Sequence, residues 1–130
     1  MGYLVSQENM DNILTKMKAK YKIYAPKRGP KYIRYGEIDS ASEIVYDEKS
    51  DFSPKEVFYP IVQTLLYFTE DTCVESKLED TRDIVLFLRP CDINGIRRLD
   101  TMFLKNGGQA DNFYARLREK VKFFMMECRD

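Results

Sequence analysis

Residues 83–100, with the sequence DIVLFLRPCDINGIRRLD, decide the fold of this 130-residue chain. The five consecutive apolar residues at 84–88 are too many for a half-exposed strand, so we expect a strand covered on both faces. Pro90 ends this strand, and Asp92 stands where a helix N-cap belongs. Beyond Asp92, apolar residues recur at spacings that place them on one helical face, namely Ile93, Ile96, Leu99 and Phe103. The stretch therefore predicts a buried strand that turns sharply into a helix.

The residues that follow predict a parallel partner for this strand. Asn106-Gly107-Gly108 supplies the glycine that a helix C-terminus prefers, and Asp111 is placed to cap a second helix. The apolar run at 121–126 then predicts a second strand. Two strands joined through helices should lie parallel, with a right-handed crossover. The expected class is α/β, with a mixed sheet and a C-terminal βαβ crossover over residues 84–126.

The N-terminal part predicts a smaller unit made of one helix and antiparallel strands. Ser6 is the expected cap of a helix that runs to about Lys20. Two short strands are expected at 21–25 and 32–37, around a proline-containing turn that indicates a sheet edge or a loop. Further expected elements are a strand at 44–46, a short helix starting at Ser53-Pro54, a strand at 61–69 and a solvated acidic loop at 70–83. This part leaves α+β as the alternative class.

Composition narrows the class of protein. The chain is 44% hydrophobic and 32% charged, and we expect residues 1–130 to form a single folded domain. Its 21 basic and 21 acidic residues cancel, which argues against a general polyanion-binding role. The absence of histidine removes the commonest acid/base and metal ligand, and the three cysteines are too widely spaced for a zinc site. With no export signal or long apolar span, we expect a cytoplasmic protein.

One stretch suggests a different function. From Lys16 to Arg34 all charged residues are basic, and tyrosines lie within or beside the run, up to Tyr35. Such a mixture at 16–35 can bind single-stranded nucleic acid through backbone charge and base stacking. We favour the alternative of a solvated helix face followed by a hairpin, because no RNA-binding motif is present. A nucleic acid is therefore an unexpected partner.

The turn after the central strand is the candidate functional region. Parallel strands finish at the same edge of a sheet, so Cys91 and Cys128 are expected at one edge. We expect a docking edge formed by Arg89, Cys91, Asp92, Glu127 and Cys128. A thiol enzyme built on Cys91 is a further hypothesis, since a helix N-terminus favours a thiolate. Without a base nearby, we favour a small residue that fills a tight turn, with Asp92 as the helix cap and Arg89 paired with it.

Several blocks of the sequence resemble a known family. These blocks are Gly2-Tyr3-Leu4-Val5, Tyr24-Ala25-Pro26-Lys27, residues 33–38, residues 50–56, residues 84–100, Phe103-Leu104 and Asn106-Gly107-Gly108. Together they resemble the A-subunit family of anaerobic sulfite reductases, over essentially the whole chain. The Arg-Pro-Cys-Asp turn at residues 89–92 is also similar to the related iron–sulfur subunits of cytoplasmic hydrogenases.

The resemblance implies an electron-transfer subunit of an oxidoreductase complex. Such a subunit passes electrons through ferredoxin-type [4Fe–4S] clusters, from a flavin- and nicotinamide-binding subunit to a sirohaem subunit that reduces sulfite. A cubane cluster needs about four closely spaced thiolates, which Cys73, Cys91 and Cys128 do not supply. We therefore expect the cluster-free N-terminal domain of a longer iron–sulfur subunit, which docks onto its own C-terminal ferredoxin-like module. This domain should hold no cofactor, have no catalytic activity of its own and bind no membrane.

Overall fold

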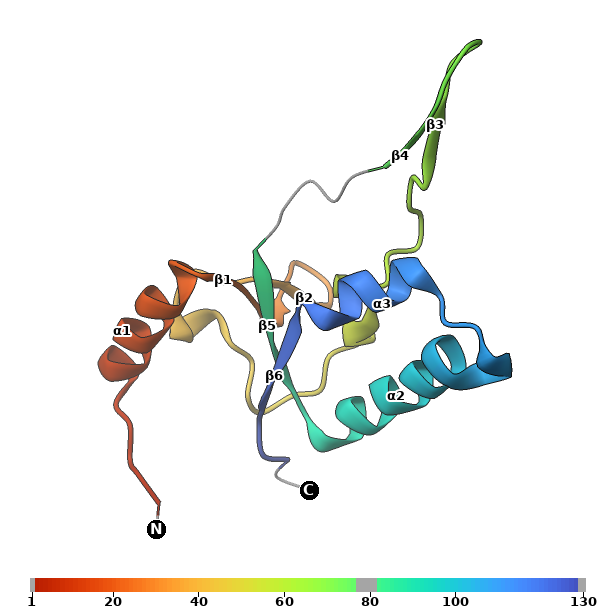
Figure 1. Ribbon diagram of the computed structural model, residues 1–130. Helices are drawn as coiled ribbons and strands as arrows, with labels where there is room; N and C mark the ends of the chain where they lie inside the picture. Colours follow the sequence, from red (N-terminus) through yellow and green to blue (C-terminus); the bar gives the residue numbers. More distant parts are fainter. Residues whose placement is uncertain (1, 77–81, 129–130) are drawn as a thin grey trace.

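The computed structural model describes residues 2–76 and 82–128, and it confirms the α/β class (Figure 1). Four strands form one mixed sheet in the order β2-β1-β5-β6, and β3 and β4 form a separate two-stranded sheet. The central strand β5 (Asp83–Leu88) lies parallel to β1 (Tyr21–Arg28) on one side and to β6 (Val121–Met125) on the other. The parallel pairing predicted for 84–88 and 121–126 is therefore correct.

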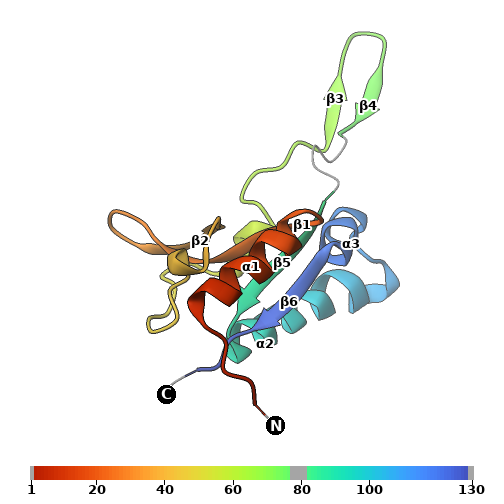
Figure 2. The same ribbon diagram turned by 90° about the vertical axis from the view of Figure 1, so that its left-hand side faces the viewer.

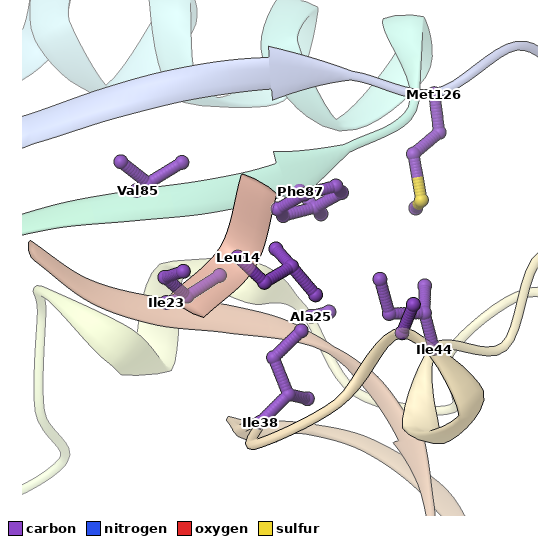
Figure 3. Close-up of a cluster of buried hydrophobic side chains, with 9 residues drawn as sticks. Leu14, Ile23, Ala25, Ile38, Ile44, Val85, Phe87 and Met126 are labelled. Carbon is purple, nitrogen blue, oxygen red and sulfur yellow. The ribbon is translucent and has the colours of Figure 1, made fainter. Parts of the chain in front are cut away.

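The helices cover the sheet on both faces, as Figure 2 shows. Helix α1 (Gln7–Lys18) lies against one face, and α2 (Pro90–Asp100) and α3 (Asn112–Glu119) lie against the other. Successive side chains of β5 therefore enter two different cores. Val85 and Phe87 pack with Leu14 of α1 (Figure 3), whereas Leu86 and Leu88 pack with residues of α2 and α3. This two-sided burial explains the uninterrupted apolar run.

The turn from β5 into α2 differs from the prediction in one respect. Arg89 occupies the N-cap position and Pro90 is the first helical residue, so Asp92 is not the cap. The reason is that proline lacks an N–H and has a helical φ, which suits the first turn of a helix. Asp92 instead lies within the first turn, where its negative charge complements the helix dipole.

Helix α2 continues without a break into a π-helical turn, η3 (Thr101–Lys105), which is followed by η4 (Asn106–Gly108). Gly107 and Gly108 have φ values of 69° and 75°, which non-glycine residues rarely adopt. Asp111 then caps α3, because its side chain accepts a hydrogen bond of 2.8 Å from the Tyr114 backbone N–H. Both predicted helix signals in this region are therefore confirmed.

The N-terminal elements agree with the prediction in type, with differences in extent. Ser6 caps α1 by accepting from the Asn9 N–H. Strand β1 is antiparallel to β2 (Ile33–Glu37) and runs three residues beyond the expected end. Pro26 is therefore inside β1. It is tolerated because β1 pairs with β5 only over Tyr21–Tyr24, so no parallel ladder bond is required at residue 26.

Of two short predicted elements, the strand at 44–46 is wrong and the helix start at Ser53-Pro54 is confirmed. The strand expected at 44–46 is wrong: Ile44 makes a single isolated bridge to Lys27, directly after the 3-10 turn η1 (Ala41–Glu43). The helix expected at Ser53-Pro54 is the short 3-10 helix η2 (Pro54–Val57), with Ser53 accepting from the Lys55 N–H. The backbone of the 44–46 segment contacts β1 through the bridge to Lys27 and through a hydrogen bond of 2.8 Å from the Val45 N–H to the Pro26 carbonyl.

The strand predicted at 61–69 is largely wrong. Only β3 (Leu66–Phe68) is a strand, and it pairs with β4 (Cys73–Glu75) in an exposed hairpin that projects from the body (Figures 1 and 2). The acidic loop expected at 70–83 thus contains β4 and the first residue of β5, and its residues 77–81 lie outside the described residues. No helix in the described part of the chain is long and apolar enough to cross a lipid bilayer.

Candidate functional site at the carboxyl edge of the sheet

Arg89 is the centre of the candidate site. It is the one charged residue among the buried residues that the structure describes, with 7% of its surface exposed. Its Nη2 donates to the backbone carbonyls of Glu48 at 2.7 Å and Tyr46 at 3.1 Å. Its Nη1 lies 3.5 Å from Sγ of Cys128. One guanidinium therefore joins the end of β5 to the 46–48 segment and to the chain that follows β6.

The alternation of β5 explains why Arg89 points this way. Val85 and Phe87 face the α1 side of the sheet, and Arg89 is the next odd-numbered residue in extended conformation. Beyond β6, Met126 continues the ladder through its N–H, which donates to the Leu88 carbonyl at 2.7 Å, and it belongs to the same core as Phe87. Cys128, two residues further, reaches the guanidinium from that side.

The two other members of the β5–α2 turn have different surroundings. Cys91 is exposed in the first turn of α2. Asp92 is half-buried, and its Oδ2 accepts a hydrogen bond of 3.4 Å from the Tyr35 hydroxyl of β2. Burial, together with the negative charge of Asp92, raises the pKa of Tyr35 above its ordinary value. Tyr35 therefore stays a neutral hydrogen-bond donor at physiological pH.

Glu127 lies on an open groove beside this edge. One cavity of about 580 Å³ is lined by Glu127 together with Ile44, Tyr46, Asp47, Phe124 and Met126. A second cavity, of about 470 Å³, shares Ile44 and Tyr46 and extends between the N-terminal segment and η1. The sheet edge therefore carries a groove lined by apolar side chains and by two acidic ones, Asp47 and Glu127.

The structure brings Arg89 and Cys128 into contact and places Cys91 and Asp92 in the helical turn next to them. The docking role of the five residues stays a prediction. Sequence reasoning missed Tyr35, because β2 is separated from β5 by β1 in the sheet and no local pattern links Tyr35 to the turn. It also missed Tyr46 and Glu48, which act through backbone carbonyls that no side-chain pattern reveals. The pairing of Arg89 with Asp92 expected from sequence is replaced by these carbonyl contacts.

The cysteines do not form the donor set of a cubane cluster. Cys73 belongs to the projecting hairpin, whereas Cys91 and Cys128 lie at the opposite end of the molecule (Figure 1). Among residues 2–76 and 82–128, no three side chains of His, Cys, Asp or Glu are grouped to hold a metal ion. The chain contains no histidine, and no hydrogen bond in the described part of the chain joins a side chain to Cys91, so the thiol-enzyme hypothesis gains no support from this geometry.

The basic stretch is partly neutralised by acids of the same molecule. Ion pairs join Lys18 to Asp39, Lys27 to Glu43, Arg28 to Glu48 and Arg34 to Glu56. The hydrogen bond from Lys27, aided by the backbone N–H groups of Asp39 and Ser40, lowers the pKa of Glu43. These pairs reduce the positive charge available to a nucleic acid, so the structure favours the interpretation as a solvated face.

Comparison with known proteins finds similarity to one sulfhydrogenase. The chain is 23% identical over 121 residues to the sulfhydrogenase 2 subunit beta of Pyrococcus furiosus. The alignment covers 93% of this chain and 36% of that subunit, so the chain spans about a third of its relative's length. No family model matches the chain, and no solved structure matches it significantly.

Proposed function

We propose that this chain is a docking domain of an iron–sulfur electron-transfer subunit, within an oxidoreductase complex. The observation that carries the proposal is the similarity, along 93% of the chain, to one subunit of a sulfhydrogenase. The blocks that resemble the A-subunit family of anaerobic sulfite reductases support the same class of protein. In this proposal the domain performs no chemistry itself.

The geometry of the sheet edge supports a docking role. Arg89 fixes the segment that follows β6 by its contact with Cys128, and it fixes the 46–48 segment through two carbonyls. Buried hydrogen bonds to a charged donor are strong and directional, so this edge is a rigid platform. A ferredoxin-like module of the full subunit, beyond the third that this chain spans, would pack against the platform and the groove beside it.

The relative's name favours a hydrogenase-type complex, which is the alternative suggested by the Arg-Pro-Cys-Asp turn. The finer assignment, a sirohaem complex that reduces sulfite, rests on the sequence blocks alone. In either complex we propose that the electron donor is a flavin- and nicotinamide-binding subunit. The two chemistries differ in the final electron acceptor, so they can be separated by activity.

The experiment is the anaerobic isolation of this chain, affinity-tagged, from the cells that produce it. We expect an assembly with the electron paramagnetic resonance signal of reduced [4Fe–4S] clusters in stoichiometric amount, and with reductase activity driven by a nicotinamide cofactor. Sulfide formed from sulfite would identify one complex, and hydrogen evolution the other. Isolation of the chain without any iron–sulfur signal would contradict the proposal.

A pair of variants tests whether the sheet edge is the docking surface. Arg89→Ala should reduce the recovered iron–sulfur signal per tagged chain, because the platform loses its anchor. Arg98→Ala removes an exposed arginine of the same helix and should leave the signal unchanged. Circular dichroism of each purified variant separates a loss of docking from a loss of fold. Equal signals in both variants, with both folded, would exclude this edge as the docking surface.

A further inference from the structure

The β3–β4 hairpin exposes an unusual amount of apolar surface. Seven large apolar side chains of residues 61–76 are solvent-exposed: Ile61, Val62, Leu65, Leu66, Tyr67, Phe68 and Val74. Ile61 and Val62 are each 85% exposed, and Phe68 is 73% exposed. In the hairpin, Leu66 and Phe68 lie on one face and Tyr67 and Val74 on the other, so both faces expose apolar side chains. Exposed apolar surface of this extent marks an interaction site on a soluble protein.

The hairpin nevertheless has a defined local structure. The Thr69 N–H donates to the Thr72 carbonyl at 2.8 Å, and the Thr72 N–H donates to Oγ1 of Thr69 at 3.1 Å. At its base, Glu75 forms an ion pair with Arg116 of α3. An isolated two-stranded hairpin is only marginally stable in water, so a surface that covers this one would stabilise it.

The charges of the hairpin define the chemistry of that surface. Residues 61–76 contain three acids, Glu70, Asp71 and Glu75, and no lysine or arginine. Glu75 is engaged by Arg116, which leaves two carboxylates at the tip, Glu70 and Asp71. The complementary surface is therefore an apolar groove with basic side chains at its rim.

The same chain carries such a groove at the β1–β2 turn. A cavity of about 420 Å³ is lined by Gly29, Pro30, Lys31, Tyr32, Arg34 and Phe52. The rings of Tyr32 and Phe52 meet edge to face at 5.7 Å, and the Arg34 guanidinium lies 5.0 Å from the centre of the Phe52 ring. Arg34 is paired with Glu56, but no acid of the described residues forms an ion pair with Lys31. The groove thus has an aromatic floor and, at its rim, a cation that the described acids leave unpaired.

Within one molecule the hairpin and the groove are far apart. Figure 2 shows the β1–β2 turn and the β3–β4 hairpin projecting from different sides of the body. We infer that the occupant of the groove is the hairpin of a second copy of this chain, and that the two copies exchange hairpins symmetrically. The contact between hairpin and groove then forms twice, once in each direction, which closes the dimer. This inference does not depend on the proposed electron-transfer function.

The inference is tested by sedimentation equilibrium of the full chain over a wide concentration range. We expect a dimer, and we expect Phe68→Ser to raise its dissociation constant by at least about tenfold, as for a buried aromatic anchor. Met102→Ser is the matched control, since Met102 is 61% exposed on η3 and belongs neither to residues 61–76 nor to the lining of the groove, so this variant should dimerise normally. A monomeric wild-type chain, or equal dimerisation of both variants, would overturn the inference.

A charge exchange makes the test specific to the two surfaces. The hairpin variant Glu70→Lys/Asp71→Lys and the groove variant Lys31→Glu should each dimerise at least about tenfold more weakly, because like charges then face each other. Mixing the two variants pairs a basic hairpin with an acidic groove, and an acidic hairpin with a basic groove. We expect the mixture to form heterodimers as tightly as the wild-type chain dimerises. A mixture as monomeric as its components would overturn the inference, even if each single variant had lost self-association.

Discussion

Strands β5 and β3 both come from long apolar runs, yet β5 is the most buried of the described strands and all three residues of β3 are exposed. Strand β5 has a hydrogen-bonded neighbour on each side and a helical layer on each face. Strand β3 has one neighbour, β4, and their hairpin projects from the body, with the ion pair between Glu75 and Arg116 as its link to α3 (Figure 1). An apolar run therefore predicts residues that favour burial. Whether other elements of the same chain bury them depends on the rest of the fold.

The largest expected difference between the two strands is in how much a truncated side chain lowers the free energy of unfolding. Leu86→Ala should lower the free energy of unfolding by about 2–5 kcal/mol, because Leu86 is 0% exposed and its loss leaves a cavity. Leu66→Ala, on the 44% exposed β3 residue, should cost less than about 1 kcal/mol in dilute monomer. Chemical denaturation monitored by circular dichroism measures both. Equal losses would show that the hairpin belongs to the core after all.

The second prediction concerns the polar anchor at the end of β5. Arg89→Ala should cost about 1–3 kcal/mol, because it leaves the carbonyls of Tyr46 and Glu48 without their buried donor. Arg89→Lys should recover only part of the lost stability: the ammonium keeps a charged donor, but it cannot reproduce the geometry of the guanidinium. Arg98→Ala, on the exposed face of α2, is the control for denaturation and should change stability little. If Arg89→Ala matched that control, the edge would not be a rigid platform.

The buried strand and its turn could be predicted from sequence because their signals are local. The uninterrupted apolar run, the proline and the Asp111 cap each fix the backbone within a few residues, and the structure bears them out. The assignment of Asp92 as N-cap was wrong because Pro90 is a better first helical residue than a strand terminator. The observed cap, Arg89, lies three positions before the predicted one, and backbone geometry decides between them.

The exposed hairpin and the site could be predicted only in part, because they depend on distant segments. Nothing within residues 61–69 tells whether a second layer will cover them. The donors of Arg89 were predicted to meet a carboxylate, but they meet the carbonyls of Tyr46 and Glu48, more than forty positions away. The wrong strand at 44–46 has the same origin, since Ile44 is held by one bridge to Lys27 rather than by a ladder.

The smallest expected effect comes from the surface ion pairs and depends on pH. The contact with Lys27 lowers the folded-state pKa of Glu43 below its ordinary 4.5, so the ionised side chain stabilises the fold above that pH. This stability, below about 1 kcal/mol, is lost as the pH falls through the lowered folded-state pKa. Wild type should therefore lose its advantage over Glu43→Gln on acidification from pH 7 to pH 3, measured by thermal melts.

Glu48→Gln is the matched control for this pH series, because it removes an ion pair whose two side chains are both more than half exposed. Its stability difference from wild type should be smaller than that of Glu43→Gln at pH 7. A pH-independent difference between wild type and Glu43→Gln would show that the contact with Lys27 contributes nothing through charge.

The contrast between β5, which the chain itself buries, and β3, which we infer is buried by a second copy, is tested most directly by hydrogen–deuterium exchange of the dilute chain. We predict that the amides of β5 exchange only through global unfolding, whereas those of β3 and β4 exchange orders of magnitude faster. Raising the protein concentration should then slow exchange in the hairpin and in residues 29–34, with β5 unchanged. Hairpin amides as protected as those of β5 at the lowest concentration would contradict the account, because the chain would then already cover its own hairpin.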